Sequence, residues 1–364
     1  MNIGIDISQI AYPATGVGKY TEGLVRAILD NDSVNIWTFV FSSFRGSINT
    51  DLKKRILASR HRFIKLPFSP KMLSVLSNTF HIFPVETVTG PLDFFITSDW
   101  TEPPAKCKKA TIIHDLTFLR FPEVVHETIL KTQQKRLALV QKESSLIIAV
   151  SETTKKDVVN LLHINPSKVK TIYSGVLTDI PNKKVLDTTK NKFHVQKPFV
   201  LSVGKLEPRK NIKRLIASWN EIDQNEYELL IVGPEGWDFD EKDKQNKNIR
   251  FLGRVTDEEL DGLYELCNFF IYPSVWEGFG YPILEAMQHK KAVATSDVSS
   301  LKELGEDHSF LFDPKSTEDI KRALIALMKN SEMKEDLARR GFEYASQFTW
   351  KRYMGHLINT LSSL

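Results

Sequence analysis

The chain has little cysteine and no long apolar run. Only Cys107 and Cys267 are present among its 364 residues, far apart and each without a close cysteine or histidine partner. This usage predicts a reducing compartment and argues against both a disulfide framework and a zinc cage. No stretch approaches the roughly 20 apolar residues of a membrane span. No basic segment followed by an apolar one opens the sequence, so we expect a cytoplasmic protein without a secretory signal.

The composition is that of a globular protein, with 41% hydrophobic and 26% charged residues. At this length two domains are the default expectation. Residues 1–180 hold 22 Lys and Arg against 16 Asp and Glu, a balance of +6, and the rest hold 27 against 29, a balance of −2. Basic segments at 60–71 and 106–109 favour an anionic partner, for which we expect a membrane surface and not nucleic acid. The alternative is an ordinary solvated face.

Short apolar strands alternate with helical stretches, which is typical of a parallel sheet covered by helices. We expect strands near 3–7, 36–41, 93–97, 110–115, 146–150 and 169–173, a helix over about 127–142, and another helix capped by Ser151. Residues 42–90 have no clear pattern, and 179–197 are polar and aperiodic. The alternation restarts at 199. We therefore predict an α/β protein with domains 1–178 and 198–345, a linker 179–197, and a last helix within 346–364 that packs back on the first domain.

The segment 274–287 stands out, because it follows a buried strand and contains two carboxylates, Glu277 and Glu285, eight positions apart. Gly278 and Gly280 allow close backbone approach to a ligand, and Pro282 suits the start of a helix whose free N–H groups attract anions. Carboxylates accept hydrogen bonds from hydroxyl pairs, so a phosphorylated, hydroxyl-rich ligand such as a nucleotide sugar fits. The alternative is an ordinary strand-to-helix turn with surface glutamates.

Other polar groups also follow predicted strands. Residues 205–210 carry three cations, Lys205, Arg209 and Lys210, which could neutralise a diphosphate. His114 and Asp115 end another strand, where a structural histidine is the alternative. The turn at 16–18 does not match the dinucleotide-binding pattern, because Thr21 stands where the third glycine is required. It does not match the Walker pattern either, because Tyr20 follows Gly18-Lys19 where Ser or Thr is required. We expect a flexible loop there. Asp238 and Asp240 imitate an Asp-x-Asp metal motif, but lie in a polar run that we interpret as solvated.

Taken in chain order, these blocks resemble a family-4 retaining glycosyltransferase of the GT-B fold, with similarity from residue 2 to about 350. Glu277 to Glu285 is similar to the Glu-x7-Glu motif of that family, and 203–211 resembles its phosphate-binding segment. The further matching blocks are 16–18, 114–115, 150–152 and 251–255. Two residues depart from the pattern: Lys205 stands where many members carry Arg, and Ser174 where Asn is common. The resemblance implies two facing Rossmann-like doubly wound domains, a deep interdomain cleft and C-terminal helices.

The resemblance also implies roles for individual residues. Arg209, Lys210 and Lys205 would hold the diphosphate, Glu285 the ribose hydroxyls, and the Val255 main chain the base. The transferred sugar would be bound from one domain by Glu277 with the backbone of Gly278, Phe279, Gly280 and Tyr281, and from the other by His114. The loop of Gly16, Val17 and Gly18 would close over the donor. No metal or other cofactor is expected, because lysine and arginine supply the positive charge.

The implied function is transfer of a hexose, with mannose from GDP-mannose as first choice, to a growing or lipid-linked glycan in cell-surface polysaccharide synthesis. A UDP-sugar-dependent transferase of the same fold is one alternative. A catalytically inactive glycan-binding or scaffold module is another, and the intact Glu277, Glu285, Lys210 and His114 count against it. The third is an unrelated sugar epimerase or phosphorylase.

Overall fold

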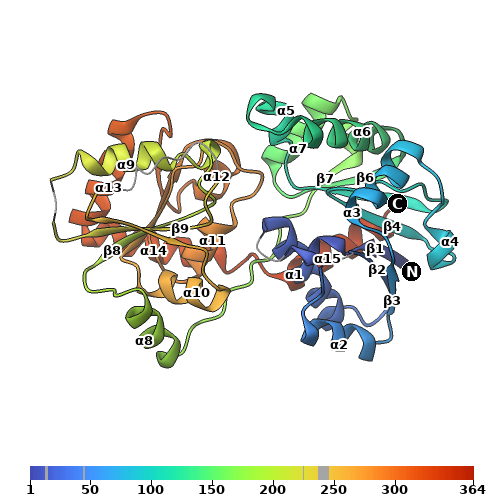
Figure 1. Ribbon diagram of the computed structural model, residues 1–364, viewed down its shortest axis with the longest axis horizontal. Helices are drawn as coiled ribbons and strands as arrows, with labels where there is room; N and C mark the ends of the chain where they lie inside the picture. The colour runs from blue at the N-terminus through green and yellow to red at the C-terminus, as the bar shows by residue number, and fades with distance from the viewer. Residues whose placement is uncertain (13–14, 44–45, 224, 237–245) are drawn as a thin grey trace. The chain divides into compact units, whose positions relative to one another are not determined.

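The computed structural model describes residues 1–12, 15–43, 46–223, 225–236 and 246–364. These residues fold into two compact units (Figure 1). Unit 1 comprises Met1–Gly175 together with Phe348–Leu364, and unit 2 comprises Val176–Gln347. Each unit is an α/β layer structure in its own right.

Unit 1 is built on a seven-stranded parallel sheet. Its strand order is β3-β2-β1-β4-β5-β6-β7. The strands are β1 (Asn2–Asp6), β2 (Ile36–Ser42), β3 (Arg62–Leu66), β4 (Phe94–Ser98), β5 (Lys108–Ile113), β6 (Ser144–Ala149) and β7 (Val169–Thr171). The α-helices are α1 (Gly16–Asn31), α2 (Thr50–Ala58), α3 (Pro70–Ser74), α4 (Glu86–Thr89), α5 (Thr117–Arg120), α6 (Glu127–Glu143), α7 (Glu152–Leu162) and α15 (Trp350–Ser362).

Unit 2 repeats this plan with a six-stranded parallel sheet. Its order is β10-β9-β8-β11-β12-β13. The strands are β8 (Phe199–Val203), β9 (Glu228–Val232), β10 (Ile249–Gly253), β11 (Phe269–Tyr272), β12 (Val293–Ser296) and β13 (Phe310–Phe312). The α-helices are α8 (Lys183–Lys192), α9 (Ile212–Asn220), α10 (Asp257–Leu266), α11 (Tyr281–Gln288), α12 (Ser299–Gly305), α13 (Thr317–Lys329) and α14 (Ser331–Ala345). In Figure 1, α9 and α13 lie on one side of this sheet and α10 on the other.

The predicted pair of parallel, helix-covered sheets is confirmed, because both sheets are doubly wound. In each sheet the first strand of the unit lies inside, and the strand order reverses beside it. The periodic apolar residues that predicted the strands form the cores. In unit 2, Leu229 and Ile271 of the sheet pack with Leu215 and Trp219 of α9, all nearly fully buried. Burial of each such side chain contributes about 1.5–3 kcal/mol.

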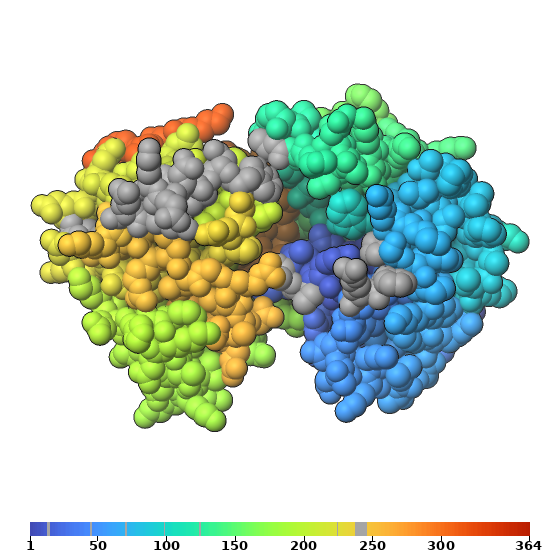
Figure 2. Space-filling view, in the orientation of Figure 1, coloured from blue at the N-terminus to red at the C-terminus, as the bar shows by residue number. Residues whose placement is uncertain are grey.

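The structure corrects two local predictions. Residues 42–90 are not irregular throughout, since they contain α2, β3, α3, the π-helix η2 (Val75–Phe80) and α4. The segment 179–197 contains α8, whose Asn182 caps its first turn by accepting a hydrogen bond from the Val185 N–H. Figure 2 shows α8, in lime, beside α10, in orange, on the surface of unit 2. A Cβ on Gly262 of α10 would lie 2.5 Å from Thr189 Oγ1 of α8, so the glycine allows this close packing.

The expected flexible loop at 16–18 is wrong as well. These residues form the first turn of α1, with the Thr15 hydroxyl accepting a hydrogen bond from the Gly18 N–H at 3.0 Å. A Cβ on Gly18 would lie 2.2 Å from the Tyr12 carbonyl oxygen. Glycine is therefore required here by the close approach of Tyr12 to the helix start, and not by loop flexibility.

The last helix, α15, belongs to unit 1 although it follows unit 2 in the sequence. Its Trp350 lies against α1, where a Cβ on Gly23 would be 2.2 Å from the indole ring. The Tyr20 and Tyr353 hydroxyls are hydrogen-bonded, and the rings of Tyr20 and Trp350 meet edge to face at 5.5 Å. This aromatic contact completes the packing on α1.

Candidate functional site

The topology of unit 2 brings two predicted polar segments together. Strands β8 and β11 are neighbours in register, with Val200 opposite Phe269, and both run in the same direction. Their carboxyl ends therefore meet at one edge, at the point where the strand order reverses and α/β proteins place their ligands. The segment 204–211 leaves β8 at this edge and 273–280 leaves β11.

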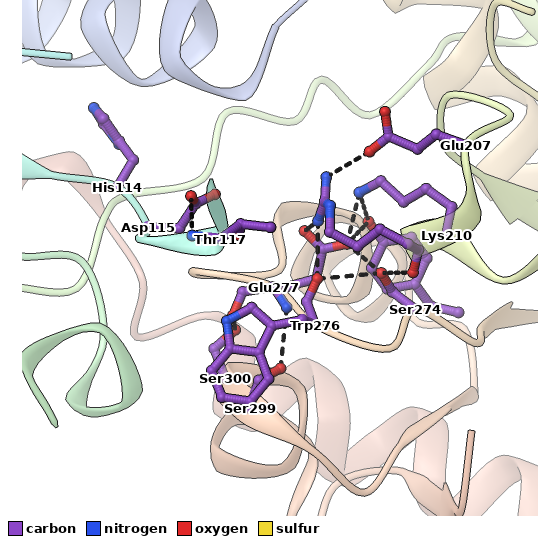
Figure 3. Close-up of polar contacts among 12 residues, drawn as sticks. His114, Asp115, Thr117, Glu207, Lys210, Ser274, Trp276, Glu277, Ser299 and Ser300 are labelled. Atoms are coloured by element: carbon purple, nitrogen blue, oxygen red, sulfur yellow. Dashed lines mark hydrogen bonds and ion pairs between the residues drawn. The ribbon is translucent and has the colours of Figure 1, made fainter. Parts of the chain in front are cut away.

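Glu277 is the centre of a buried polar cluster at this edge (Figure 3). Lys210 Nζ donates to Glu277 Oε1 at 2.6 Å, and Arg209 lies 2.7 Å from Oε2. The hydroxyl of Tyr272 donates to Oε1 at 3.0 Å, and that of Ser274 also faces Oε1. Glu277 is only 9% exposed. Its carboxylate thus fixes both cations in place.

The charges in this cluster shift the pKa values of its members. Burial by itself raises the pKa of Glu277, but Arg209 and Lys210 outweigh it and hold this pKa at about 2. Burial lowers the pKa of Lys210, as does Arg209, while Glu277 opposes the shift. Burial and the nearby Glu277 raise the pKa of Tyr272 well above its usual value. Glu277 is therefore ionised at neutral pH and is unsuited to act as a general acid.

Lys210 keeps hydrogen-bonding capacity within the cluster. An ammonium group has three donors. Among the described residues, Nζ uses two of them, one toward the Tyr272 hydroxyl at 2.6 Å and one toward Glu277. Arg209 donates to Glu207 at 2.9 Å and to the Trp276 carbonyl at 2.8 Å. Two cations held this rigidly, one with a donor to spare, can receive an anionic ligand without rearranging.

Hydrogen bonds to backbone groups hold the two segments to each other and to α12. The Arg209 carbonyl accepts a hydrogen bond from the Val275 N–H at 2.9 Å. Asn211 donates to the carbonyls of Pro273 and Pro314 at 3.0 and 2.7 Å. The Ser299 hydroxyl accepts from the Glu277 N–H, and the Ser300 hydroxyl donates to the Glu277 carbonyl. The site therefore depends on both segments, on α12 and on the loop that follows β13.

The other residues predicted in this half lie around the same edge. Glu285, on the second turn of α11, is buried and accepts a hydrogen bond from the Tyr264 hydroxyl at 2.9 Å. Lys205 is exposed and Val255 half-buried. Gly280 precedes α11 with φ 113°, a conformation that favours glycine. Gly278 lies in the same turn, and the rings of Phe279 and Tyr281 meet edge to face at 5.1 Å.

In unit 1, His114 follows β5 as predicted. Burial, with a contribution from Arg136, lowers the pKa of His114 to about 3. The imidazole meets the edge of the Tyr20 ring at 4.7 Å. The Asp115 carboxylate accepts a hydrogen bond from the Thr117 N–H at 3.0 Å. His114 is thus a neutral imidazole at the carboxyl end of its strand.

Two residues of the cluster were missed from the sequence. The sequence analysis assigns no role to either Tyr272 or Ser274. Both lie at the carboxyl end of β11, and this position was the signal that could have identified them. Asp238 and Asp240 lie outside the described residues. Among the described residues, no group of three or more His, Cys, Asp or Glu side chains is arranged to hold a metal ion.

Comparison with known proteins defines the class. Residues 186–344 match the family described as Glycosyl transferases group 1. In structure, the chain is similar along its whole length to Anabaena HepE in complex with UDP-glucose, with a TM-score of 0.75 and 19% identity. It also resembles WaaG, a glycosyltransferase involved in lipopolysaccharide biosynthesis, with a TM-score of 0.69, 14% identity and 98% of each chain covered. The chain is therefore a glycosyltransferase of the GT-B fold, with a group 1 domain in unit 2.

The proteins most similar in sequence among those compared include O-antigen chain mannosyltransferases. The chain is 26% identical over 382 aligned residues, covering 100% of both proteins, to the O-antigen chain mannosyltransferase B of Escherichia coli. It is 27% identical to the O-antigen chain mannosyltransferase RfbU of Salmonella typhimurium over 251 residues, 65% of this chain and 64% of that protein.

Proposed function

We propose that this glycosyltransferase moves a hexose, with mannose from GDP-mannose as first choice, from a nucleotide sugar to a growing glycan of a cell-surface polysaccharide. The observation that carries the proposal is the buried cluster of Arg209, Lys210 and Glu277 at the carboxyl edge of β8 and β11. Similarity over the full length to an O-antigen chain mannosyltransferase supports mannose. The solved complexes of HepE with UDP and with UDP-glucose keep UDP-sugars as the second candidate.

In the proposed reaction the anomeric C–O bond breaks and the electron pair goes to the diphosphate. Lys210 and Arg209, with Lys205 at the exposed rim, stabilise the negative charge that develops there. One preorganised donor of this kind contributes about 3–4 kcal/mol to the transition state. The acceptor hydroxyl forms the new bond on the same face of the sugar, so the anomeric configuration is retained. Its proton passes to the leaving phosphate oxygen.

The remaining roles follow from the family-4 resemblance. We assign Glu285 to the ribose hydroxyls, the Val255 main chain to the base, and Glu277 with the backbone of 278–281 to the transferred sugar. We assign neutral His114 to the same sugar and the helix start at 16–18 to the donor. Because the cations are lysine and arginine, we propose turnover without a metal ion, so that rates measured with and without EDTA should agree.

The test is incubation with each of GDP-mannose, UDP-glucose, UDP-galactose and UDP-N-acetylglucosamine, with lipid-linked and free oligosaccharide acceptors. Release of nucleoside diphosphate and the configuration of the product are measured. Release with GDP-mannose, and a product that keeps the donor's anomeric configuration, is the expected result. Binding of glycan without release from any donor would favour the inactive module instead. Free epimerised sugar without acceptor would indicate an epimerase.

We propose in addition that unit 1 contacts an anionic membrane during this reaction. Among the described residues, no helix is both long and apolar enough to span a bilayer. Six apolar side chains in 72–88 are nonetheless 40–66% exposed, namely Met72, Val75, Phe80, Ile82, Phe83 and Val88. Three of them, Ile82, Phe83 and Val88, line a cavity of about 280 Å³ whose walls are mostly apolar.

Exposed cations lie in the same part of the chain. Arg60, Arg62, Lys65 and Lys71 precede the apolar segment in the chain, and Figure 2 shows this region of unit 1 in light blue. Apolar side chains that enter the headgroup region, flanked by basic residues, are typical of peripheral attachment to anionic lipid. Sedimentation with vesicles of phosphatidylglycerol and of phosphatidylcholine tests this.

We expect binding to phosphatidylglycerol that weakens in salt, and a loss of binding in Phe80→Ser/Phe83→Ser. The control is Leu161→Ser, which removes an apolar side chain that is 38% exposed on α7 and lies outside 72–88. Equal partitioning of all proteins to both vesicles, independent of salt, would refute the membrane contact and leave the transferase proposal intact.

A further inference from the structure

A buried histidine at the end of α11 is held between two carboxylates of α10. His289 is 4% exposed. Its Nε2 lies 3.0 Å from Asp261 Oδ1, and its Nδ1 lies 3.2 Å from Glu265 Oε2. Carboxylates only accept hydrogen bonds, so both ring nitrogens must carry a proton to satisfy this geometry. The residue is thus an imidazolium that ties α10 to α11.

The charges around this imidazolium favour its protonated form. Asp261 and Glu265 face it from α10, and the carboxyl end of the α11 dipole also attracts a cation. The nearby cations are Lys290 and Lys291, which point to other partners: Lys291 Nζ donates to the Glu265 carbonyl, and Lys290 lies over the Phe342 ring. Burial lowers the pKa of His289, but the hydrogen bonds and charges of Asp261 and Glu265 outweigh it and raise this pKa above 6.5.

Tyr264 connects this ion cluster to Glu285. Its ring stacks on the imidazole at 5.6 Å between centroids, with the planes 15° apart. Its hydroxyl donates to Glu285 Oε2 at 2.9 Å, and the side chain is fully buried. One face of the ring is thus fixed by His289 while its polar end orients the carboxylate. Glu285 lies one helical turn before His289, whose N–H donates to the Glu285 carbonyl at 3.1 Å.

We propose that His289 is a positioning residue for the donor: it holds Tyr264, and through Tyr264 it holds Glu285 in the orientation that receives the ribose hydroxyls. This rests on the proposed function, which assigns Glu285 to the ribose. The imidazolium clamps the helix that carries Tyr264 against the helix that carries Glu285. Neither residue touches the reacting atoms, so loss of the clamp acts on donor affinity and not on bond breaking.

The experiment compares three variants in the full-length protein. His289→Gln keeps a side chain of similar length but cannot donate to both carboxylates with a positive charge. Tyr264→Phe keeps the stacked ring and removes only the hydroxyl bond to Glu285. His308→Gln is the matched control, because His308 also stacks on a tyrosine of unit 2, Tyr344, at 4.1 Å, and has no place in this chain of contacts.

We expect His289→Gln and Tyr264→Phe each to raise the donor KM, and the Kd of the nucleoside diphosphate, roughly 5–30-fold. The kcat at saturating donor stays at the wild-type value, and His308→Gln behaves as wild type. In the wild type and in His308→Gln, the Kd also rises as the pH increases through the pKa of His289. That rise is absent in His289→Gln. The phosphate of the nucleoside diphosphate also titrates near pH 6, and its effect on the Kd is the same for the wild type and every variant.

The outcomes separate the inference from its premise. If the wild type binds GDP or UDP and His289→Gln binds it equally well at every pH, the inference is wrong and the proposed function stands. If kcat falls while KM is unchanged, His289 does not position the donor and the inference is also wrong. If the wild type binds no nucleoside diphosphate, the proposed function fails and the inference fails with it. Hydrogen exchange of 257–289 provides a further check, since it should increase in His289→Gln but not in His308→Gln.

Discussion

At the scale of single residues, the Glu277 carboxylate has two effects on its cluster. It neutralises two half-buried cations in the folded protein, and it keeps them where an anionic ligand can meet them. Of the two cations, Lys210 can redirect a hydrogen bond to a ligand more easily, because a lysine is a point charge with three rotatable donors. Arg209 is fixed at several acceptors, including Glu207 and the Trp276 carbonyl.

The first prediction concerns Lys210→Ala. Removing this cation should lower kcat by roughly 10²–10³-fold, because the negative charge of the leaving diphosphate loses a fixed donor. Lys213→Ala serves as control, since Lys213 is exposed on the neighbouring helix α9. Steady-state rates with the preferred donor provide the measurement. An unchanged kcat in Lys210→Ala would remove this residue from the diphosphate site.

The second prediction concerns Glu277→Gln and pH. Neutralising the carboxylate leaves the half-buried Arg209 and Lys210 side by side without their shared counter-charge, which should lower the free energy of unfolding by about 3–5 kcal/mol at pH 7. The folded pKa of about 2 lies below the usual value of 4.5, so the wild-type advantage is present above pH 4.5 and fades as the pH falls toward 2. Denaturant unfolding of both proteins at pH 7 and pH 3.5 checks this. A difference independent of pH would contradict it.

At the scale of elements, the start of α11 depends on the conformation of one residue. Gly280 has φ 113° and ψ 46°, and it turns the chain from the Glu277 segment into the helix. The Gly280 Cα also lies close to α12, since a Cβ there would be 3.0 Å from Leu301 Cδ2. Both the positive φ and the packing therefore select glycine.

The third prediction follows from this turn. Gly280→Ala should lower the free energy of unfolding by about 1–2 kcal/mol, because a Cβ is strained in the left-handed region. The matched control is Gly355→Ala in the middle of α15, where a Cβ would meet no atom within 4 Å. That substitution should stabilise by about 0.4–1 kcal/mol by restricting the unfolded chain. Thermal denaturation shifts of opposite sign are expected, and shifts of the same sign would refute the account.

At the scale of the whole molecule, the C-terminal segment Phe348–Leu364 belongs to unit 1 and not to the unit that precedes it in the sequence. The helix α15 supplies Trp350 and Tyr353 to a buried contact with α1, and the backbone of Gly175 also lies against Trp350. A stop at residue 347 would remove no residue of unit 2, which ends at Gln347. It would nevertheless uncover Tyr20 and the face of α1 around Gly23.

The fourth prediction is that truncation after Gln347 destabilises unit 1 and spares unit 2. Hydrogen exchange should show faster exchange in α1 and unchanged protection in β8 and β11. Trp350→Ala is the milder form, expected to lower stability by about 3–5 kcal/mol, as for other large buried aromatics. Full protection of α1 in the truncated protein would show that α15 contributes no stability to unit 1.

Much of the fold could be predicted from the sequence, because most strands of these parallel sheets are short, continuous apolar runs. The helix cap at Ser151 was also readable, and its hydroxyl accepts the Thr154 N–H at 3.0 Å. The strand β3 was not predicted, because Arg62 and Lys65 interrupt its apolar pattern at the edge of the sheet. The turn at 16–18 was misjudged, because glycines suggest loops and the helix start there depends on the Thr15 cap and the approach of Tyr12.

The sequence by itself determined the alternation of strands and helices, and with it two parallel sheets whose carboxyl edges carry the polar segments. It also determined which charged residues follow which strand. Only the tertiary structure decided that Lys210 and Arg209 bond to Glu277, 67 residues away from Lys210. It likewise decided that Tyr264 donates a hydrogen bond to Glu285 and stacks on His289. The physical reason is that strand order, which no local pattern encodes, chooses which loops become neighbours.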